Sequence, residues 1–247
     1  MEFKDYFSSQ AKEYAKFRPK YPPELFEYLS TLVNEHQLAW DCATGNGQAA
    51  VGLAPYFDEI IATDASASQI EHAEQHPKIK YKIAPAESSG LETKSADLIT
   101  VATAIHWFNT ARFYDEARRI LKPGGVIAIW LYGNNAIEPV VDMVFGRFFQ
   151  DIIGNYWPEE IKKALNFEEM IDFPFTKIEP PNFEIRLMWN LKEYLSYLYT
   201  WSSTQNYIKA NGKNPIGTIF DDFQIAWGDE NHKKEIKWDL KMKVGRV

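Results

Sequence analysis

The chain has 247 residues, a net charge of −7 at pH 7 and an aromatic content of 15%. This length suits one α/β domain with a modest cap, because single hydrophobic cores stop growing near ~250–300 residues. The acidic balance, without a cluster of Lys and Arg, argues against a nucleic-acid substrate, while the many aromatic side chains can fill a core and line a pocket for a small molecule.

Short β-type runs alternate with helical patterns through the first half of the chain. This alternation is typical of strand-helix-strand units, which build a parallel sheet. We therefore predict an α/β fold with a Rossmann-like, doubly wound sheet of seven mostly parallel strands. The predicted strands are Leu38–Cys42, Glu59–Thr63, Lys80–Ile83, Asp97–Ala102 and Gly125–Trp130, and the predicted helices between them are Gln48–Leu53, Ala67–Glu74 and Ala111–Leu121.

The pattern changes after Trp130. Glu138–Gly154 and Glu159–Met170 have helical patterns with aromatic faces, and no new parallel strand frames them, so we predict an inserted helical cap. Two later runs, Phe183–Trp189 and Ile236–Val244, alternate with period two, which is typical of half-buried strands. We expect these two runs to extend the far edge of the sheet.

The sequence also favours a cytoplasmic protein. Cys42 is the single cysteine, which excludes an internal disulfide, and the first residues lack the basic start and apolar run of a signal peptide. The most apolar helical stretch, residues 140–157, carries three charged side chains, too many for a membrane span. We therefore expect no membrane partner.

A glycine-rich turn follows the first predicted strand. After Asp41 come Ala43, Gly45 and Gly47, small residues of the kind needed where a backbone turns sharply and approaches a ligand. The turn opens a helix, whose N-terminal amides favour a carboxylate or a phosphate. The spacing also fits the G-x-G-x-x-A form of dinucleotide sites, with Asp64 placed to meet a ribose. The turn alone leaves open a dinucleotide and a cofactor that carries an amino acid.

Further motifs follow the turn in a fixed order. The set is Asp41-x-x-x-Gly45-x-Gly47, Asp64, Ala86-Glu87, Ala96-Asp97-Leu98-Ile99, His106-Trp107-Phe108 and Leu121-Lys122-Pro123-Gly124-Gly125. In this order the motifs resemble those of class I S-adenosylmethionine-dependent methyltransferases. The run from Phe7 to Pro22, together with the His-Trp-Phe element, is similar to the trans-aconitate methyltransferase-like branch. Ala43 departs from the family, which usually has glycine there, and we expect the alanine to lower cofactor affinity.

The resemblance implies S-adenosyl-L-methionine as cofactor and a role for each motif. Gly45 and Gly47 would lie beside the methionine part, with Asp41 near its ammonium group. Charge supports this assignment, because Asp41 would attract the ammonium and sulfonium groups but repel a pyrophosphate. Asp64 would accept from the ribose hydroxyls, and the Ala86 amide and Glu87 carboxylate would contact the adenine edge. The predicted cofactor-binding residues are Asp41, Ala43, Gly45, Gly47, Asp64, Ala65, Ala86, Glu87, Ala102 and Trp107.

The acceptor side offers fewer signals. His106 follows the fourth predicted strand, at the edge where doubly wound sheets bind ligands, and three roles stay open for it: packing, ligand contact and general base. Arg18 is suited to pair with an acidic acceptor, although it also fits a plain surface arginine. We predict His106 and Arg18 as catalytic residues. The predicted acceptor-binding residues are Tyr14, Arg18, Tyr21, His106, Trp130 and Tyr132.

These observations predict a methyltransferase that acts on a small molecule, with a carboxylate among the candidate acceptors. The alternatives are an NAD-dependent oxidoreductase and a catalytically silent cofactor-binding protein. We expect no metal, because His72 and His76 lack a third ligand nearby, and a monomer or weak homodimer. The predicted single domain, 1–247, comprises an N-terminal lid over 1–30, a cofactor-binding core over 31–132 and helical cap insertions over 133–180 and 190–230.

Overall fold

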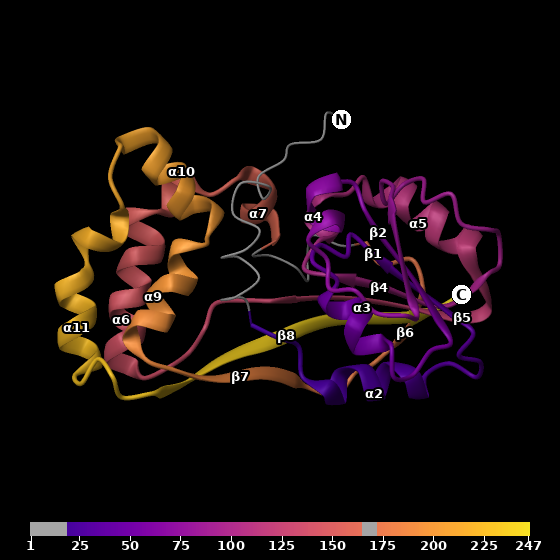
Figure 1. Cartoon of the computed structure of the whole chain (residues 1–247), viewed down its shortest axis with the longest axis horizontal. Helices are drawn as coiled ribbons and strands as arrows, with labels where there is room; N and C mark the ends of the chain where they lie inside the picture. Colours follow the sequence, from indigo (N-terminus) through magenta and orange to yellow (C-terminus); the bar gives the residue numbers. More distant parts are fainter. Residues whose placement is uncertain (1–18, 165–171) are drawn as a thin grey trace.

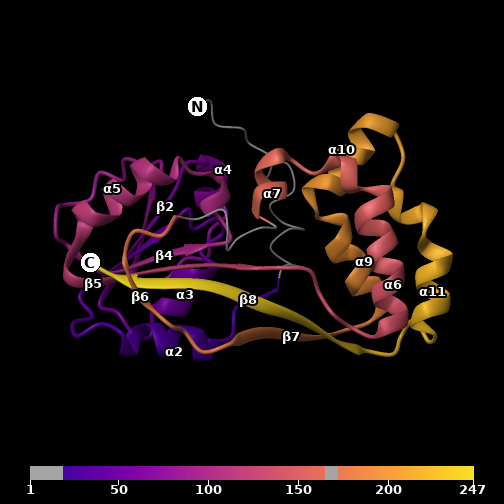
Figure 2. The same ribbon diagram turned by 180° about the vertical axis from the view of Figure 1, so that it is seen from behind.

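The computed structural model of the chain describes residues 19–164 and 172–247. These residues form two lobes, one with the parallel strands and their helices and one made of helices alone (Figure 1). Long antiparallel strands run from the first lobe to the second, as the view from behind also shows (Figure 2). The strands are β1 Leu38–Cys42, β2 Glu59–Asp64, β3 Ile79–Ile83, β4 Ala96–Ala102, β5 Leu121–Tyr132, β6 Thr176–Ile178, β7 Phe183–Trp189 and β8 Lys234–Arg246.

The eight strands of the described residues belong to one sheet, in the order β3-β2-β1-β4-β5-β8, with β6 and β7 both paired to the outer edge of β8. The first five are parallel, and β8 is antiparallel to its neighbours. The Rossmann-like class is confirmed, but the predicted count of seven strands is wrong. Pro180 and Pro181 separate β6 from β7, because proline has no N–H to donate to β8.

The predicted strands agree closely with the observed ones, and the largest difference is at β5. This strand begins at Leu121, which pairs with Ala96, and regular pairing resumes only where Val126 meets Leu98. The Lys-Pro-Gly-Gly run therefore forms an irregular start of the strand rather than a separate turn. The two late runs predicted at the far edge of the sheet are β7 and β8, as expected.

Helices cover both faces of the parallel strands. Alternate residues of β5 show the division. Val126, Ala128 and Trp130 pack in the core under α2 (Pro23–Thr31) and α3 (Gln48–Leu53), whereas Ile127 and Ile129 pack under α5 (Thr110–Ile120). No helix of the described residues is long and apolar enough to cross a membrane. The helices are α2 Pro23–Thr31, α3 Gln48–Leu53, α4 Ala67–Glu71, α5 Thr110–Ile120, α6 Pro139–Arg147, α7 Glu159–Ala164, α9 Leu191–Tyr199, α10 Ser202–Asn211 and α11 Phe220–Trp227, with 3₁₀ helices η2 Ile105–Trp107, η4 Gly154–Tyr156 and η5 Pro215–Thr218 and the π turn η3 Phe148–Ile152.

The N-terminal part of the described chain differs from the predicted lid. Residues 23–31 form α2, a core helix whose Leu25 and Leu29 are fully buried against the sheet. Pro23 suits the first helical position, where the missing N–H would have no partner in any case. Only residues 19–22 of the described part of the predicted lid lie outside this helix, and residues 1–18 lie outside the described residues.

The helical lobe corresponds to the predicted cap. Helices α6, α9, α10 and α11 gather there (Figure 1), and Trp238 of β8 packs edge-on against Tyr197 of α9 with ring centroids 5.5 Å apart. The cap and the α2–α3 face of the sheet share one continuous hydrophobic core. Two boundaries differ from the prediction: the helix expected over 138–154 leaves α-helical geometry after Arg147, and β6, within the predicted insertion 133–180, belongs to the sheet.

Candidate functional site

The candidate site lies at the carboxyl ends of β1 and β4, where the winding of the sheet changes direction. β1 pairs with β2 on one side and with β4 on the other, so the direction of winding reverses between β1 and β4. In open α/β sheets, ligands bind outside the carboxyl ends of the strands at such a switch point. The carboxyl ends of β1, β2 and β4, together with the loops that follow them, carry most of the predicted site residues.

The glycine loop after β1 turns through three residues with positive φ: Ala43 at 55°, Gly45 at 57° and Gly47 at 86°. A Cβ on Gly47 would lie 2.2 Å from the Tyr81 hydroxyl, so a side chain there would displace Tyr81. A Cβ on Gly45 would meet nothing closer than 3.8 Å. The Gly45 and Gly47 amides donate to Asp64 and to a loop carbonyl, so these glycines supply room rather than free donors.

Asp41 is the last but one residue of β1 and is fully buried. Its Oδ1 accepts from the Thr100 hydroxyl at 2.8 Å, and its Oδ2 accepts from the Thr44 hydroxyl. Burial raises the pKa of Asp41 to about 6, although these hydroxyls and the Ala50 backbone N–H oppose the rise. The carboxylate therefore faces partners within the chain, and its predicted proximity to an ammonium group stays a prediction.

Thr44 and Thr100 were not among the predicted site residues. Thr44 lies within the glycine loop, where its hydroxyl gave no separate signal. Thr100 lies on β4, directly opposite Asp41 in the parallel register. That register brings together residues far apart in the chain, so a sequence pattern alone could not pair Thr100 with Asp41.

Asp64 ends β2 and joins two loops of the site. Its Oδ2 accepts from the Gly45 N–H at 2.9 Å, and its Oδ1 accepts from the Ser66 N–H at 2.8 Å. The side chain is half-buried, and the neighbouring Ala65 is exposed. Asp64 thus supports the glycine loop directly, and because a carboxylate oxygen can accept more than one hydrogen bond, this support is compatible with a ligand.

Glu87 lies in the loop after β3, where its Oε1 accepts from the Asn109 N–H at 2.7 Å. Asn109 caps the start of α5, so Glu87 connects the loop after β3 with the loop after β4. Ala86, beside it, is buried, and Ala102 at the end of β4 is half-buried. The contacts of Ala86 and Glu87 with an adenine stay a prediction.

His106 and Trp107 form the short helix η2 after β4. Their rings lie 4.9 Å apart between centroids, and His106 Nδ1 is buried without a hydrogen-bond partner among the described residues. Burial lowers the pKa of His106 to about 4. The imidazole is therefore neutral near pH 7 and is a weak proton acceptor there.

The predicted acceptor residues fall into three groups. Tyr14 and Arg18 lie outside the described residues. Tyr21 and Tyr132 are half-buried near each other, with ring centroids 6.4 Å apart. Trp130 differs from the prediction of a pocket-lining residue, because it is 0% exposed and packs edge-on against Tyr21 within the core. Contact between Trp130 and an acceptor would require the covering side chains to move.

The motif residue Asp97 has a structural role. Its Oδ2 accepts from the backbone N–H groups of Gln37 and Leu38, and its Oδ1 lies 2.7 Å from the Lys122 ammonium. These contacts join the start of β1 to the start of β5, at the opposite end of the strands from the glycine loop. Asp97 and Lys122 therefore hold the sheet together and do not contribute to the site.

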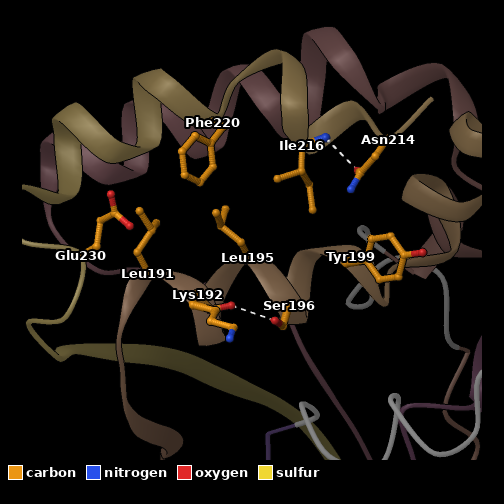
Figure 3. Close-up of a pocket in the computed structure, with 9 residues that line it drawn as sticks. All are labelled: Leu191, Lys192, Leu195, Ser196, Tyr199, Asn214, Ile216, Phe220 and Glu230. Atoms are coloured by element: carbon orange, nitrogen blue, oxygen red, sulfur yellow. Dashed lines mark hydrogen bonds between the residues drawn. The ribbon is translucent and has the colours of Figure 1, made fainter.

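A cavity lies in the cap, between helices of the helical lobe and away from the strand ends. It has a volume of about 480 Å³ and opens between α9, η5 and α11, where the apolar side chains of Leu191, Leu195, Ile216 and Phe220 converge (Figure 3). None of its lining residues belongs to the predicted site. No group of three or more potential metal ligands occurs among residues 19–164 and 172–247.

The strand-end loops fit the cofactor that the motifs imply. A Cβ on Gly45 would meet nothing closer than 3.8 Å, so the glycine loop is not crowded at this point, and the half-buried Asp64 carboxylate accepts from the Gly45 N–H. Carboxylates at this edge suit a molecule with hydroxyl groups and positive charges, whereas a pyrophosphate would be repelled by Asp41 and Asp64.

Comparisons with known proteins agree with this assignment. A family model described as a methyltransferase domain matches residues 40–129. A methyltransferase of Dictyostelium discoideum is 35% identical over 224 residues, which cover 88% of this chain and 84% of the relative. An S-adenosylmethionine-dependent methyltransferase of Saccharomyces cerevisiae is 26% identical, with 85% of each chain covered. A solved type II methyltransferase from Anaeromyxobacter dehalogenans is 36% identical with a TM-score of 0.88, covering 93% of this chain and 98% of the other.

These matches give no support to an NAD-dependent oxidoreductase, the alternative that the glycine loop leaves open. The Dictyostelium relative and the Anaeromyxobacter structure extend well beyond the glycine loop and include the cap. The similarity therefore concerns the whole arrangement of sheet and cap rather than the nucleotide-binding half alone.

The buried Asp41 carboxyl group should make stability depend on pH. Because its pKa in the fold, about 6, lies above the ordinary value of 3.8, the folded state binds the proton more tightly and loses stability as pH rises from about 4 to about 6. Asp41→Asn should remove this loss and raise the free energy of unfolding at pH 7 by about 1–3 kcal/mol. Urea unfolding of both proteins between pH 4 and pH 7 measures the difference. Equal pH slopes would contradict the prediction.

Ala43 should be strained by its left-handed backbone. An L-residue in that conformation is strained by about 1–2 kcal/mol, and glycine relieves this strain. Glycine also gives the unfolded chain more conformational entropy, which offsets part of the gain, so Ala43→Gly should stabilise the fold by roughly 1 kcal/mol. The melting temperature should rise by about 2–4 °C. Ala111→Gly, in the first turn of α5, is the matched control and should lower it. A lower melting temperature for Ala43→Gly would mean that the strain is absent.

Proposed function

This chain belongs to the S-adenosylmethionine-dependent methyltransferases of the class I fold, and we propose that it methylates a carboxylate oxygen of a small organic acid. The bound cofactor supplies a methyl group already activated by its sulfonium charge, so displacement requires an aligned acceptor more than it requires acid-base help. A carboxylate suits such a site because its oxygen attacks without losing a proton.

The observation that supports this proposal is that the acidic side chains around the strand ends already accept hydrogen bonds from the chain itself. Asp41 accepts from two threonine hydroxyls, Asp64 from two backbone N–H groups and Glu87 from the Asn109 N–H. Asp41 is fully buried, and Asp64 and Glu87 already hold loops of the chain. Each of these groups is therefore better placed to hold a loop or a ligand than to reach the proton of an acceptor.

His106 completes the argument. It is the histidine of the described residues that lies on the loop after β4, and burial keeps the pKa of its imidazole near 4. A general base works best when its pKa is near the working pH, so His106 is poorly matched to deprotonating a hydroxyl or an ammonium group at pH 7. Its neutral ring can instead pack beside Trp107 and exchange a hydrogen bond with the acceptor.

The cofactor assignments form part of the same proposal. Asp64 accepts from the ribose hydroxyls, Gly45 and Gly47 give room to the methionine part, and the Ala86 amide with Glu87 contacts the adenine. Asp41 acts through its charge rather than by direct contact, because it is fully buried behind Thr44 and Thr100. Trp107 covers the cofactor from the side of the loop after β4.

Recognition of the acceptor is assigned to the N-terminal segment and the aromatic residues beside it. Arg18, which lies outside the described residues, pairs with the carboxylate that is not methylated or orients the one that is, while Tyr21 and Tyr132 line the pocket. The N-terminal run and the His106-Trp107-Phe108 element also support the finer placement in the trans-aconitate methyltransferase-like branch. The net charge of −7 further favours a small acceptor over a polyanion.

Asp64 should dominate cofactor affinity. Asp64→Ala removes an acceptor of two charge-assisted hydrogen bonds to the ribose and the support of the Gly45 N–H, so S-adenosylmethionine binding should weaken by about 2–4 kcal/mol. Asp64→Asn keeps one oxygen acceptor and should lose less of the binding free energy than Asp64→Ala. Calorimetric titration measures both, with circular dichroism as the check on folding. Normal binding by a folded Asp64→Ala protein would remove Asp64 from the ribose site.

The acceptor itself should be found among small organic acids. Incubation of the enzyme with cofactor labelled in the methyl group and a panel of di- and tricarboxylic acids should give a methyl ester, which releases labelled methanol in mild alkali. The rate should be nearly constant from about pH 6 to about pH 8.5, because the attacking carboxylate is ionised throughout. A rate that rises steeply with pH, on amines or alcohols only, would contradict a carboxylate acceptor.

Two variants assign the residues for that acceptor. Arg18→Ala should raise the KM of the acid or lower kcat strongly, with Arg18→Lys intermediate because lysine keeps the charge but not the paired geometry. His106→Ala should cost less than the ~10²–10⁴-fold expected of an essential acid or base. Unchanged kinetics for Arg18→Ala would remove the acid-recognition role of Arg18.

A further inference from the structure

A short segment before α2, residues 19–22, contacts two loops of the site. The Gln48 amide makes both contacts on one side: its Nε2 donates to the Pro19 carbonyl, and its Oε1 accepts from the Tyr21 N–H, each at 3.2 Å. On the other side, the Tyr21 hydroxyl and the Thr103 hydroxyl lie 2.9 Å apart and share a hydrogen bond. The segment therefore connects the loop after β1 with the loop after β4.

The contact at Gln48 is well placed to act on the glycine loop. Gln48 is the first residue of α3 and directly follows Gly47. Its side chain binds two backbone groups of the segment, one donor and one acceptor, so it fixes both the position and the direction of the chain there. A shift of residues 19–21 would pull on the residue that follows the glycine loop.

The contact at Thr103 involves an unusual backbone. Thr103 follows β4 with a φ of 54°, a left-handed conformation that is rare and strained for a β-branched residue. Its N–H donates to the Trp130 carbonyl at 2.7 Å, which holds it against the end of β5. Such strain persists only where the surrounding contacts over-determine it, and the Tyr21 hydroxyl is one of those contacts.

Tyr21 is anchored by more than its hydroxyl. Its ring packs edge-on against Trp130, with centroids 5.5 Å apart at 89°, and lies 6.5 Å from the ring of Phe26 of α2. The ring position is thus set by the core, and the hydroxyl is held where Thr103 meets it. The segment is a fixed bridge in this structure rather than a loop tethered at one point.

We infer that Gln48, Tyr21 and Thr103 are positioning residues that hold the loops after β1 and β4 at the separation the cofactor requires. Residues 19–21, with the side chains of Gln48 and Thr103, are named the 19–21 bridge. The cofactor lies between these two loops in the proposed function, and this inference rests on that placement. The 19–21 bridge acts on cofactor binding through the two loops rather than through contact with the cofactor, and it lowers the cost of ordering these loops when the cofactor binds.

The test compares cofactor affinity in matched variants without any acceptor present. Tyr21→Phe and Thr103→Val each remove one hydroxyl of the same hydrogen bond, and Gln48→Met removes both amide contacts while keeping the length of the side chain. Calorimetric titration with S-adenosylmethionine and with its demethylated product should give Kd values about three- to tenfold higher than wild type for each variant.

Three controls separate positioning from general loss of structure. Thr103→Ser keeps the hydroxyl and should bind within about twofold of wild type, whereas Thr103→Val has the same branched shape without it. Thr218→Val removes a hydroxyl bonded to the Pro215 carbonyl in the cap and should leave the Kd unchanged. The double variant Tyr21→Phe with Thr103→Val should have a Kd no higher than that of the single variant with the higher Kd, because both substitutions break the same hydrogen bond.

Unchanged affinity in Tyr21→Phe and Thr103→Val, with wild type binding normally, would overturn the inference. Additive losses in the double variant would overturn it as well, since the two hydroxyls would then act separately. Equal weakening by Thr103→Ser and Thr103→Val would assign the effect to packing rather than to the hydrogen bond, again against the 19–21 bridge. Because no acceptor is present, an incorrect acceptor assignment cannot produce any of these results.

Discussion

The buried carboxylate of Asp41 is the constraint around which the carboxyl edge of the sheet is organised. A charge removed from water is tolerated only where donors of the chain replace the lost hydration. Here Thr100 supplies one donor from the neighbouring strand and Thr44 another from the glycine loop. Each bond limits where its donor can lie, so the same carboxylate fixes the register of β1 on β4 and the path of the loop. Asp64 repeats the arrangement one strand further along, through the Gly45 N–H.

Backbone strain collects at the same edge. Ala43 and Thr103 follow adjacent parallel strands, and both adopt positive φ although neither is glycine. The chain must leave the sheet sharply at these points so that the two loops diverge around the switch point. Tertiary contacts hold both residues there: Asp64 and Asp41 order the loop that contains Ala43, and Tyr21 with the Trp130 carbonyl holds Thr103. The free energy of these tertiary contacts offsets the backbone strain and keeps both loops in one defined conformation.

Local patterns in the sequence predicted the parallel half of the fold well. The predicted bounds of the strand Leu38–Cys42 and the helix Gln48–Leu53 equal the observed bounds. Hydrophobic periodicity and the glycine turn are signals carried by neighbouring residues, so the sequence contains them directly. The break between β6 and β7 has a local signal too, in Pro180 and Pro181, although alternation alone predicted one strand fewer. The boundary of the lid has a signal of the same kind, since Pro22 and Pro23 mark the start of the helical pattern of α2.

The remainder depends on contacts between distant residues. Thr100 meets Asp41 across 59 positions of the chain, and Tyr21 meets Thr103 across 82, so neither pair leaves a trace in local composition. The burial of Trp130 has the same origin, because its position on β5 suits a pocket wall until α2 and Tyr21 cover it. Local patterns could select residue types suited to the cofactor, but not which of them would be engaged by the chain itself.

The low polarity at the carboxyl ends of the strands bears on the charge of the methyl acceptor. Transfer from a sulfonium to a carboxylate removes a positive and a negative charge together and leaves a neutral thioether and a neutral ester. Opposite charges attract more strongly as their surroundings become less polar, but each charge is also less well solvated there. A site that excludes water therefore favours a reaction whose charged reactants become neutral products. The burial that lowers the pKa of His106 marks the loop after β4 as such an environment. An amine or alcohol acceptor would instead leave a proton to be placed on a group of the site, and the carboxylates around it are already held by the chain. The same low polarity therefore supports the proposed carboxylate acceptor, which neutralises the cofactor, over acceptors that need a base.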